Sequence, residues 1–239
     1  MKIGIITDIH NNIVALEAIL KYFQIEKING IICCGDIIGI GPSPEDSVQK
    51  ILNLPNLIAC VAGNHERYLT EGLQIKPQMD AGEKAQHQWE HTQLSQKSRE
   101  FLHNLPHEQQ LKINEKTIHI THFPTDKTGK YAPITYANDL PHLPDLEKVF
   151  ENINTDVVLF GHIHKKSHQK GSKIFINPGS VGCPGKDKTI ARAGILTVCE
   201  DIEYSEIDIE YNVKKVIEKI DELNYPACEV VKKIFYGIS

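Results

Sequence analysis

The chain has 239 residues, of which 41% are apolar and 24% are charged, and its formal net charge is −5. This length and composition are ordinary for a globular protein with one sizeable core. Without a dense Lys/Arg run a nucleic-acid surface is not expected, and no apolar run approaches the roughly 20 residues that cross a bilayer.

The first third of the chain alternates short apolar runs with helical patterns. Residues 2–7 (KIGIIT), 30–34 (GIICC) and 57–62 (LIACVA) have the pattern of buried strands. Between them, residues 11–28 and 43–54 show the apolar spacing and the N-terminal capping residues of helices.

Residues 67–110 are polar and mostly helical in pattern, most clearly at 95–105, and we predict a helical insertion there. The following elements are expected to be a strand at 116–122, a loop at 123–144, a helix at 145–153, strands at 156–160, 172–177, 193–199 and 202–211, and a helix at 212–223 with a last amphipathic stretch ending near Tyr236. Alternating strands and helices predict an α/β fold with much parallel pairing. No repeat or low-complexity linker interrupts the chain, so residues 1–239 are expected to form one domain.

The cysteines and the N-terminus indicate a cytoplasmic location. Cys33, Cys34 and Cys60 fall inside apolar runs and no C-x-x-C pair is present, so we expect buried free thiols in a reducing compartment. Cys183, in GSVGCPG, is the cysteine expected to be exposed. The apolar stretch of MKIGIITDIH is broken by Asp8 and is too short for a signal peptide.

Side chains that can bind a metal follow five of the predicted strands, where each strand ends. They are Asp8 and His10, Asp36, Asn64, His122, and His162 with His164. Open α/β sheets bind ligands at the carboxyl ends of their strands, so we expect these side chains to converge. Two pairs, Asp8/His10 and His162/His164, have one residue between them, and in an extended chain such side chains point the same way.

The residue types indicate which metals would bind. Carboxylates with imidazoles suit divalent transition metals such as Mn, Fe, Co, Ni or Zn, whereas sites made only of oxygen suit Mg and Ca. Seven donors are too many for one ion, so we predict two ions that share the carboxylate of Asp36. Each motif alone occurs by chance, and surface loop histidines are the alternative explanation for any one of them. Their joint order after successive strands is specific.

These blocks resemble the calcineurin-like metallophosphoesterase superfamily: D-x-H (Asp8, His10), GD (Asp36), GNH (Asn64, His65), H (His122) and GH-x-H (His162, His164), with INPGSVGCP as a further block. The resemblance implies an α/β/β/α four-layer sandwich of two mostly mixed sheets flanked by helices. It also implies that Asp8, His10 and His164 hold one ion, that Asn64, His122 and His162 hold the other, and that Asp36 bridges them. Mn or Fe is favoured, with Zn, Ni or Co compatible.

The resemblance is strongest to bacterial and archaeal phosphodiesterases and diadenosine-polyphosphate hydrolases, through GDIIGIGPSPEDSV and GNHERYL. It implies hydrolysis of a small phosphodiester or nucleotide polyphosphate by in-line attack of a metal-bridging hydroxide. His65 follows a ligand directly and is the candidate general acid. The alternatives are a phosphomonoesterase and a non-catalytic scaffold resembling the retromer small subunit. Homo-oligomerisation is left open, and no substrate-binding residue is assigned.

The sequence departs from the Ser/Thr protein phosphatases of this superfamily at one block. Those enzymes carry D-R-G soon after the bridging Asp, whereas Gly39-Ile40-Gly41 stands here. Protein phosphatase activity is therefore not expected, and the group that orients His65 is left undefined.

Other polar and aromatic residues are expected to have structural or surface roles. We expect His119 to be structural, Arg67 and Lys130 to be surface cations rather than phosphate ligands, and Trp89 to pack rather than stack on a base. Most of the remaining histidines are expected to be solvated: His87, His91, His103, His107, His142 and His168. Residues 67–110 lie between Asn64 and His122, so they form either a specificity wall at the cleft or an edge or dimer contact.

Overall fold

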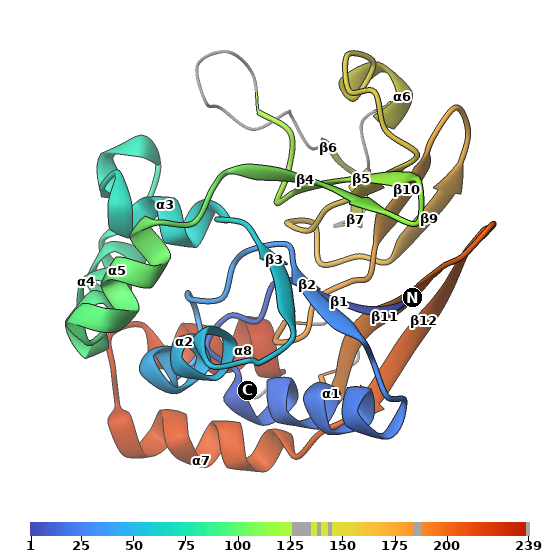
Figure 1. Cartoon of the computed structure of the whole chain (residues 1–239). Helices are drawn as coiled ribbons and strands as arrows, with labels where there is room; N and C mark the ends of the chain where they lie inside the picture. The colour runs from blue at the N-terminus through green and yellow to red at the C-terminus, as the bar shows by residue number, and fades with distance from the viewer. Residues whose placement is uncertain (126–134, 138–139, 143–144, 184–187, 238–239) are drawn as a thin grey trace.

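Two five-stranded sheets stacked face to face make up the centre of the molecule (Figure 1). This computed structural model describes residues 1–125, 135–137, 140–142, 145–183 and 188–237, with only the backbone described at 135–137 and 140–142. Helices lie outside the sheets. The expected α/β/β/α arrangement is thus confirmed.

The first sheet has the strand order β12-β11-β1-β2-β3. Its members are β1 (Lys2–Ile6), β2 (Gly30–Cys33), β3 (Leu57–Cys60), β11 (Ile190–Val198) and β12 (Ile202–Glu210). Strands β1, β2 and β3 are parallel, and β11 joins β1 antiparallel with Ile3 opposite Leu196. Parallel strands buried on both faces need continuous apolar runs, and KIGII and GIIC supply them.

The second sheet has the order β4-β5-β8-β10-β9. Its members are β4 (Glu108–Ile113), β5 (Lys116–Thr121), β8 (Val157–Leu159), β9 (Ser167–Lys170) and β10 (Ile174–Asn177). The inner strands β5, β8 and β10 are parallel, and the edge strands β4 and β9 are antiparallel to their neighbours. A separate two-stranded sheet pairs β6 (Thr135–Ala137) antiparallel with β7 (Leu140–His142).

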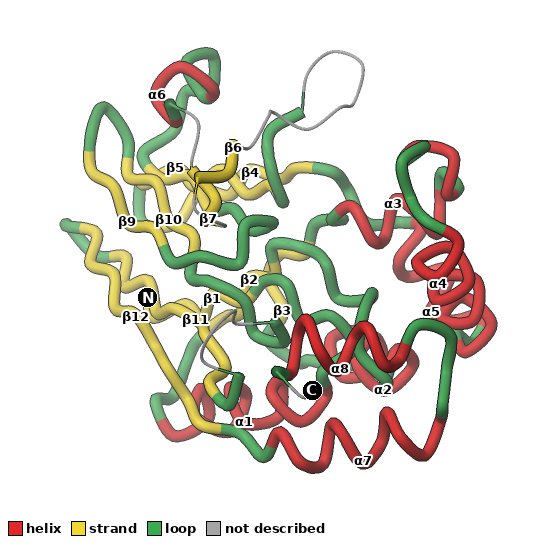
Figure 2. The backbone as a smooth tube through the Cα atoms, turned by 180° about the vertical axis from the view of Figure 1, so that it is seen from behind, coloured by secondary structure: helices red, strands yellow, loops and turns green. Residues whose placement is uncertain are grey.

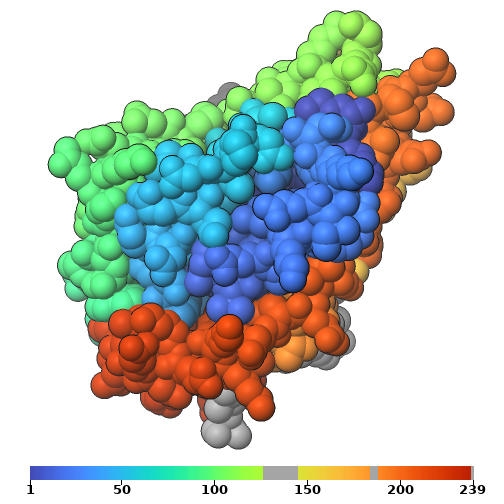
Figure 3. All heavy atoms as spheres, turned by 60° about the horizontal axis from the view of Figure 1, so that its bottom comes forward, coloured from blue at the N-terminus to red at the C-terminus, as the bar shows by residue number. Residues whose placement is uncertain are grey.

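Four helices cover the outer face of the first sheet, and Figure 3 looks toward that side of the molecule. They are α1 (Ile13–Ile25), α2 (Pro44–Leu52), α7 (Val213–Leu223) and α8 (Cys228–Tyr236). Helix α1 begins after Asn12, whose side chain accepts a hydrogen bond from the backbone N–H of Ala15 at 3.0 Å. Its apolar side, including Leu16 and Phe23, is buried against the sheet.

A second group of helices lies at one side of the sheets (Figure 1). It consists of α3 (Asn64–Thr70), a 3₁₀ turn (Leu73–Ile75), α4 (Ala81–Gln93) and α5 (Gln96–His103). Leu94 and Leu102 of this group enter the core beneath the helices. The short helix α6 (Leu146–Val149) packs Leu146 with Phe160 and Phe175 beside the second sheet.

Alternation along the strands separates two main apolar layers. Ile5 of β1 and Ile118 of β5 belong to the layer between the sheets, whereas Ile6 belongs to the layer under the helices. The two sheets are therefore joined by an apolar interface. This interface keeps the ends of β1–β3 in a constant position relative to the ends of β5 and β8.

Several element predictions were wrong. The stretch predicted as helical includes strand β4 at its end, the predicted loop at 123–144 contains the strands β6 and β7, and β9 was missed. Strand β4 is polar because it lies at an edge, and it turns into β5 through Asn114 and Glu115, both with positive φ (47° and 64°). Such turns normally show Asn-Gly, and the Glu here removes that signal.

The cysteines and the hydropathy give two further results. All six cysteines are free, and Cys33, Cys34 and Cys60 are buried as predicted. The prediction for Cys183 was wrong: it is buried, with its backbone N–H donating to Ser180 Oγ at 2.7 Å, and Cys199 is exposed instead. None of the described helices combines the length and the apolar character that crossing a membrane requires.

Candidate metal centre

The candidate donors come from the segments that follow five strands, β1, β2, β3, β5 and β8. In Figure 2 the segments directly after these strands are drawn as loops in the middle of the molecule, and the one after β3 leads into helix α3. Asp8 and His10 follow β1, Asp36 follows β2, Asn64 begins α3 after β3, His122 follows β5, and His162 and His164 follow β8. The structure brings all seven side chains into one cluster.

The donors converge through left-handed backbone and not through strand alternation. The φ angles are 53° at Asp8, 50° at His10, 51° at Asp36, 72° at His162 and 54° at His164. The expectation that the D-x-H and H-x-H pairs are extended was therefore wrong. Each such residue costs about 1–3 kcal/mol, and strain of this kind gathers at functional sites. Backbone hydrogen bonds hold it here, such as Asp8 N–H to the carbonyl of Gly35 at 3.0 Å.

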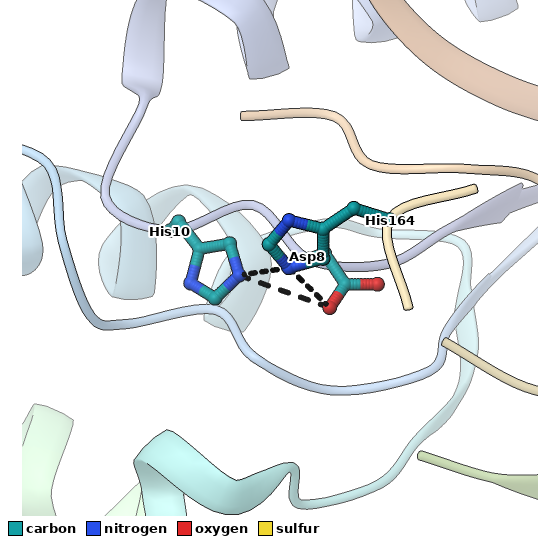
Figure 4. A group of neighbouring side chains, drawn as sticks. All are labelled: Asp8, His10 and His164. Carbon is teal, nitrogen blue, oxygen red and sulfur yellow. Dashed lines mark hydrogen bonds and ion pairs between the residues drawn. The ribbon is translucent and has the colours of Figure 1, made fainter. Parts of the chain in front are cut away.

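Asp8, His10 and His164 form one donor set, and their side chains point toward one another in Figure 4. His10 Nε2 lies 2.9 Å from His164 Nε2, and Asp8 Oδ1 lies 3.3 Å from the same His164 atom. Ligands about 2.1 Å from one cation and roughly at right angles to each other are about 3 Å apart. The spacing of these three side chains therefore fits a shared cation.

A second set contains Asn64, His122 and His162. Asn64 Oδ1 lies 2.8 Å from His162 Nδ1 and 3.2 Å from His122 Nε2. The carboxylate of Asp36 lies between the sets: its Oδ2 is 3.2 Å from His122 Nε2 and 3.8 Å from His10 Nε2. Asp36 is therefore within reach of both donor sets.

The backbone orients two of the imidazoles. Nδ1–H of His122 donates to the carbonyl of Cys34 at 2.8 Å, and Nδ1–H of His10 donates to the carbonyl of Ile38 at 3.2 Å. Each ring then directs its Nε2 toward the cluster. Metal-binding histidines are commonly oriented by such a bond at the other nitrogen.

The electrostatics of the cluster also suit cations. Burial alone would raise the pKa of Asp36. The neighbouring imidazoles, chiefly His122 and His65, outweigh burial, so the pKa of Asp36 lies well below its usual value. Burial lowers the pKa values of His10 and His162 to about 4, which keeps these rings neutral. His122 differs, because Asp36 overcomes burial and raises its pKa to about 10. A cation held at His122 Nε2 must therefore displace a proton.

Two supporting residues escaped the sequence reasoning. The buried carboxylate of Glu66 accepts the backbone N–H groups of Asp36, Ile37, Ile38 and Gly63 at 2.7–3.1 Å. Ser180 Oγ donates to the carbonyl of Asp8 at 2.7 Å. The signal for Glu66 was its place in the first turn of α3, where a Glu reaches back to the helix start. A Cβ at Gly63 would lie 2.1 Å from Asp36 Oδ1, so this close approach requires glycine.

The other histidines differ in exposure, and His91, which was expected to be solvated, is half-buried with a buried Nε2. His103, His107 and His168 are exposed, as predicted. His119 is buried, and its ring packs edge-on against that of Phe150 with 6.2 Å between the ring centroids, as expected for a structural residue. The prediction that His87 is solvated was wrong: it is 0% exposed, because α4 packs it against His65 and Tyr68. Lys130 and the side chain of His142 lie outside the described residues.

A cavity of about 760 Å³ borders the second donor set. His122 lines it together with the polar residues Arg67 and His107 and the aromatic residues Phe123 and Phe150. Arg67 also pairs with Glu71, Nε to Oε1 at 2.6 Å. The ring of Trp89 stacks on that of Tyr225 with 4.4 Å between the ring centroids, and its predicted packing role is confirmed.

Comparisons with known proteins agree with this geometry. A family model described as the calcineurin-like phosphoesterase superfamily domain matches residues 1–201. The chain is 29% identical to the uncharacterized protein MJ0912 of Methanocaldococcus jannaschii over 235 residues, which cover 94% of this chain and 93% of the relative. It is 26% identical to phosphodiesterase MJ0936 of the same organism over 211 residues, covering 88% and 100%. The crystal structure of hypothetical protein PH1004 from Pyrococcus horikoshii OT3 superposes with a TM-score of 0.82 at 20% identity, covering 100% of this chain and 99% of that one.

Proposed function

The chain belongs to the calcineurin-like phosphoesterase superfamily, and from that membership we propose that it is a dinuclear metal-dependent hydrolase of phosphodiesters or nucleotide polyphosphates. The observation that carries the proposal is the position of Asp36 between two donor sets, with Oδ2 near His122 and near His10. Mn or Fe suits this mixture of carboxylates and imidazoles, and Zn, Ni or Co is compatible with it.

The proposed ligands divide as the geometry groups them. Asp8, His10 and His164 would hold one ion, and Asn64, His122 and His162 the other. Two such ions, when bound, supply an activated water nucleophile and neutralise charge on the phosphoryl oxygens. Both carboxylates are buried and accept backbone N–H groups, Asp8 from His162 and Asp36 from His65, which fixes their orientation.

His65 is proposed to protonate the leaving oxygen. It is the residue after Asn64, its Nε2 lies 4.0 Å from Asp36 Oδ2, and 13% of its side chain is exposed. The ring is thus near the proposed ions and within reach of a substrate. Burial holds the pKa of His65 well below its usual value in the free chain, and the negative charge of a bound phosphodiester opposes that shift.

The cavity beside His122 supports a substrate larger than a phosphomonoester. Its wall combines the aromatic rings of Phe123 and Phe150 with the cation Arg67. An apolar surface next to a positive charge suits the base and the phosphate of a nucleotide. The scaffold alternative is disfavoured, because all seven proposed ligands and His65 are present and gathered at one site.

Hydrolysis assays on model esters test this proposal. The Mn²⁺-loaded protein should hydrolyse bis(p-nitrophenyl) phosphate faster than p-nitrophenyl phosphate, and chelator treatment should abolish both activities. Re-addition of metal should restore them. A preference for the monoester would indicate a phosphomonoesterase, and inactivity at every metal loading would indicate a binding protein. A panel of cyclic nucleotides and dinucleoside polyphosphates then defines the substrate class.

A further inference from the structure

The ring of His65 has two chemically different sides. Its Nε2 faces Asp36 and the donor cluster. Its Nδ1, the other ring nitrogen, is buried and has no hydrogen-bond partner within the described residues. A general acid needs a partner at the second nitrogen, because that partner decides the orientation and tautomer of the ring.

Gly39 lies beside this unpartnered nitrogen, and His87 lies beside the ring. Gly39 adopts a φ of 97°, and a Cβ there would lie 2.1 Å from His65 Nδ1, so the backbone of Gly39 touches the ring. The ring of His87, from α4, has its centroid 5.1 Å from that of His65. Nε2 of His87 is also buried without a partner within the described part of the chain. Two neighbouring imidazoles, tilted by 46°, thus each have one unsatisfied nitrogen.

Glu90 connects both of these groups. Its carboxylate is 0% exposed and accepts hydrogen bonds from the backbone N–H of Gly39 and from Asn11 Nδ2. It also accepts from His87 Nδ1–H at 3.1 Å. With its proton at Nδ1, His87 has a lone pair at Nε2, and Nε2 is the atom of His87 that lacks a partner.

We propose that Glu90 and His87 are positioning residues for His65. In this arrangement, Nε2 of His87 accepts the Nδ1–H of His65, through one bridging water or after a small ring rotation, and the ring keeps its Nε2 toward the leaving oxygen. During the reaction the proton at His65 Nε2 moves to that oxygen, while the proton at Nδ1 stays in place. This inference rests on the proposed function and assigns a role to residues 67–110, from which both side chains come.

The same helix allows a different use of these side chains. His87, Glu90 and His91 lie close enough together to hold one cation, and His91 Nε2 is also buried without a partner in the described residues. The three hydrogen bonds already accepted by Glu90 favour the positioning role. A metal content one ion higher in the wild type than in His87→Leu would overturn it.

The test compares two esters that differ only in the leaving group, methyl p-nitrophenyl phosphate and methyl phenyl phosphate. p-Nitrophenolate departs without a proton, whereas phenolate needs one. His87→Leu and Glu90→Gln should lower turnover of the phenyl ester by about tenfold or more and that of the nitrophenyl ester by less than about threefold. His91→Leu is the matched control, because His91 directly follows Glu90 on the same helix. It should leave the ratio of the two rates unchanged.

Combining the changes with His65→Ala separates positioning from stability. If His87 acts through His65, His87→Leu should reduce the activity of His65→Ala by less than about twofold. Equal losses on both esters, or fully additive losses in the double variant, would overturn the inference while the wild-type activity still supports the proposed function. A wild type that hydrolyses neither ester would instead reject the proposed function, and this inference with it.

Discussion

At the residue scale, Asp36 is the side chain on which the two donor sets depend together. Its Oδ2 approaches His122 and His10, and its Oδ1 accepts the backbone N–H of His65 at 2.9 Å. One carboxylate therefore links both proposed ions to the proposed acid. No other candidate donor has contacts of this kind to both sets and to His65 among the described residues.

Asp36→Asn should weaken the binding of both proposed ions. The neutral amide removes the negative charge that two cations share, so metal content should fall from about two ions per chain to below about one at concentrations that saturate the wild type. Elemental analysis after dialysis measures this. His164→Gln is the matched control, because it touches only the first set. A variant that loses one ion and keeps the other fully occupied would contradict the bridging role.

His65→Ala tests the acid. Metal content should be unchanged, and turnover of esters with poor leaving groups should fall by about 10²–10⁴-fold because the leaving oxygen must depart unprotonated. The loss should shrink for p-nitrophenyl esters. Steady-state rates on a series of substituted phenyl esters measure the dependence. A loss that is constant across the series would show that His65 does not supply the proton.

At the element scale, Glu66 joins the segment after β2 to helix α3. It is 0% exposed and accepts backbone N–H groups of Asp36, Ile37, Ile38 and Gly63. The positive φ of Asp36 is therefore held from outside its own strand. This contact lets a strained loop keep one conformation.

Glu66→Ala should destabilise the fold strongly. Each buried N–H left without an acceptor costs about 1–3 kcal/mol, so the free energy of unfolding should fall by more than about 3 kcal/mol. Urea denaturation followed by circular dichroism measures it. Glu222→Ala, on the exposed side of α7, should change stability by less than about 0.5 kcal/mol. Similar stabilities for the two variants would contradict the bracing role.

The contacts of the segment 67–110 indicate more than one role. Arg67 and His107, near its two ends, line the cavity beside His122, while Leu94 and Leu102 enter the core and Glu90 lies behind His65. Deleting the segment would remove core and support together. Point substitutions at the cavity are the cleaner test of a specificity wall.

Arg67→Ala combined with His107→Ala should spare the chemistry and change selectivity. Hydrolysis of bis(p-nitrophenyl) phosphate should stay within about threefold, whereas the ranking among nucleotide substrates should shift by more than about tenfold, or about 1.4 kcal/mol of transition-state binding. Glu71→Gln controls for the ion pair of Arg67. Unchanged ratios of kcat/KM across the substrate panel would assign the segment to stability alone.

At the scale of the whole molecule, the candidate centre joins the two sheets. Asp8, Asp36 and Asn64 follow strands of the first sheet, whereas His122, His162 and His164 follow strands of the second. Cations held there would bind the native state and not the unfolded chain, in which the donors are dispersed. Metal binding should therefore stabilise the entire fold.

Mn²⁺ should raise the unfolding temperature of the chelator-treated protein. At a free concentration one hundred times the dissociation constant, a site that exists only in the native state adds about 2.7 kcal/mol. Scanning calorimetry across a Mn²⁺ series measures the shift. Asp36→Asn should show a much smaller one. An unfolding temperature independent of Mn²⁺ in the wild type would contradict a metal centre between the sheets.

Prediction from sequence succeeded where the signal is local. The apolar runs of β1, β2 and β3, the capped helix α1 and the donor types after each strand are all readable without coordinates. It failed at β4, whose polar edge pattern and Asn114-Glu115 turn carry no strong signal. It also misjudged how the donors converge, because left-handed φ at residues such as Asp8 and His162 depends on partners distant in the chain.

The sequence by itself determined the family resemblance, the candidate donor residues and the order of the strands that they follow, because each depends on residue type and local pattern. Only the tertiary structure decided which side chains support the centre. In the sequence, three residues look like ordinary polar helix residues: Glu66, His87 and Glu90. All three are buried between α3, α4 and the loop after β2. There Glu66 accepts a hydrogen bond from Asp36, Glu90 accepts one from Gly39, and His87 packs beside His65. Burial of this kind is set by packing between segments that lie far apart in the chain, and helical periodicity within one segment does not encode it.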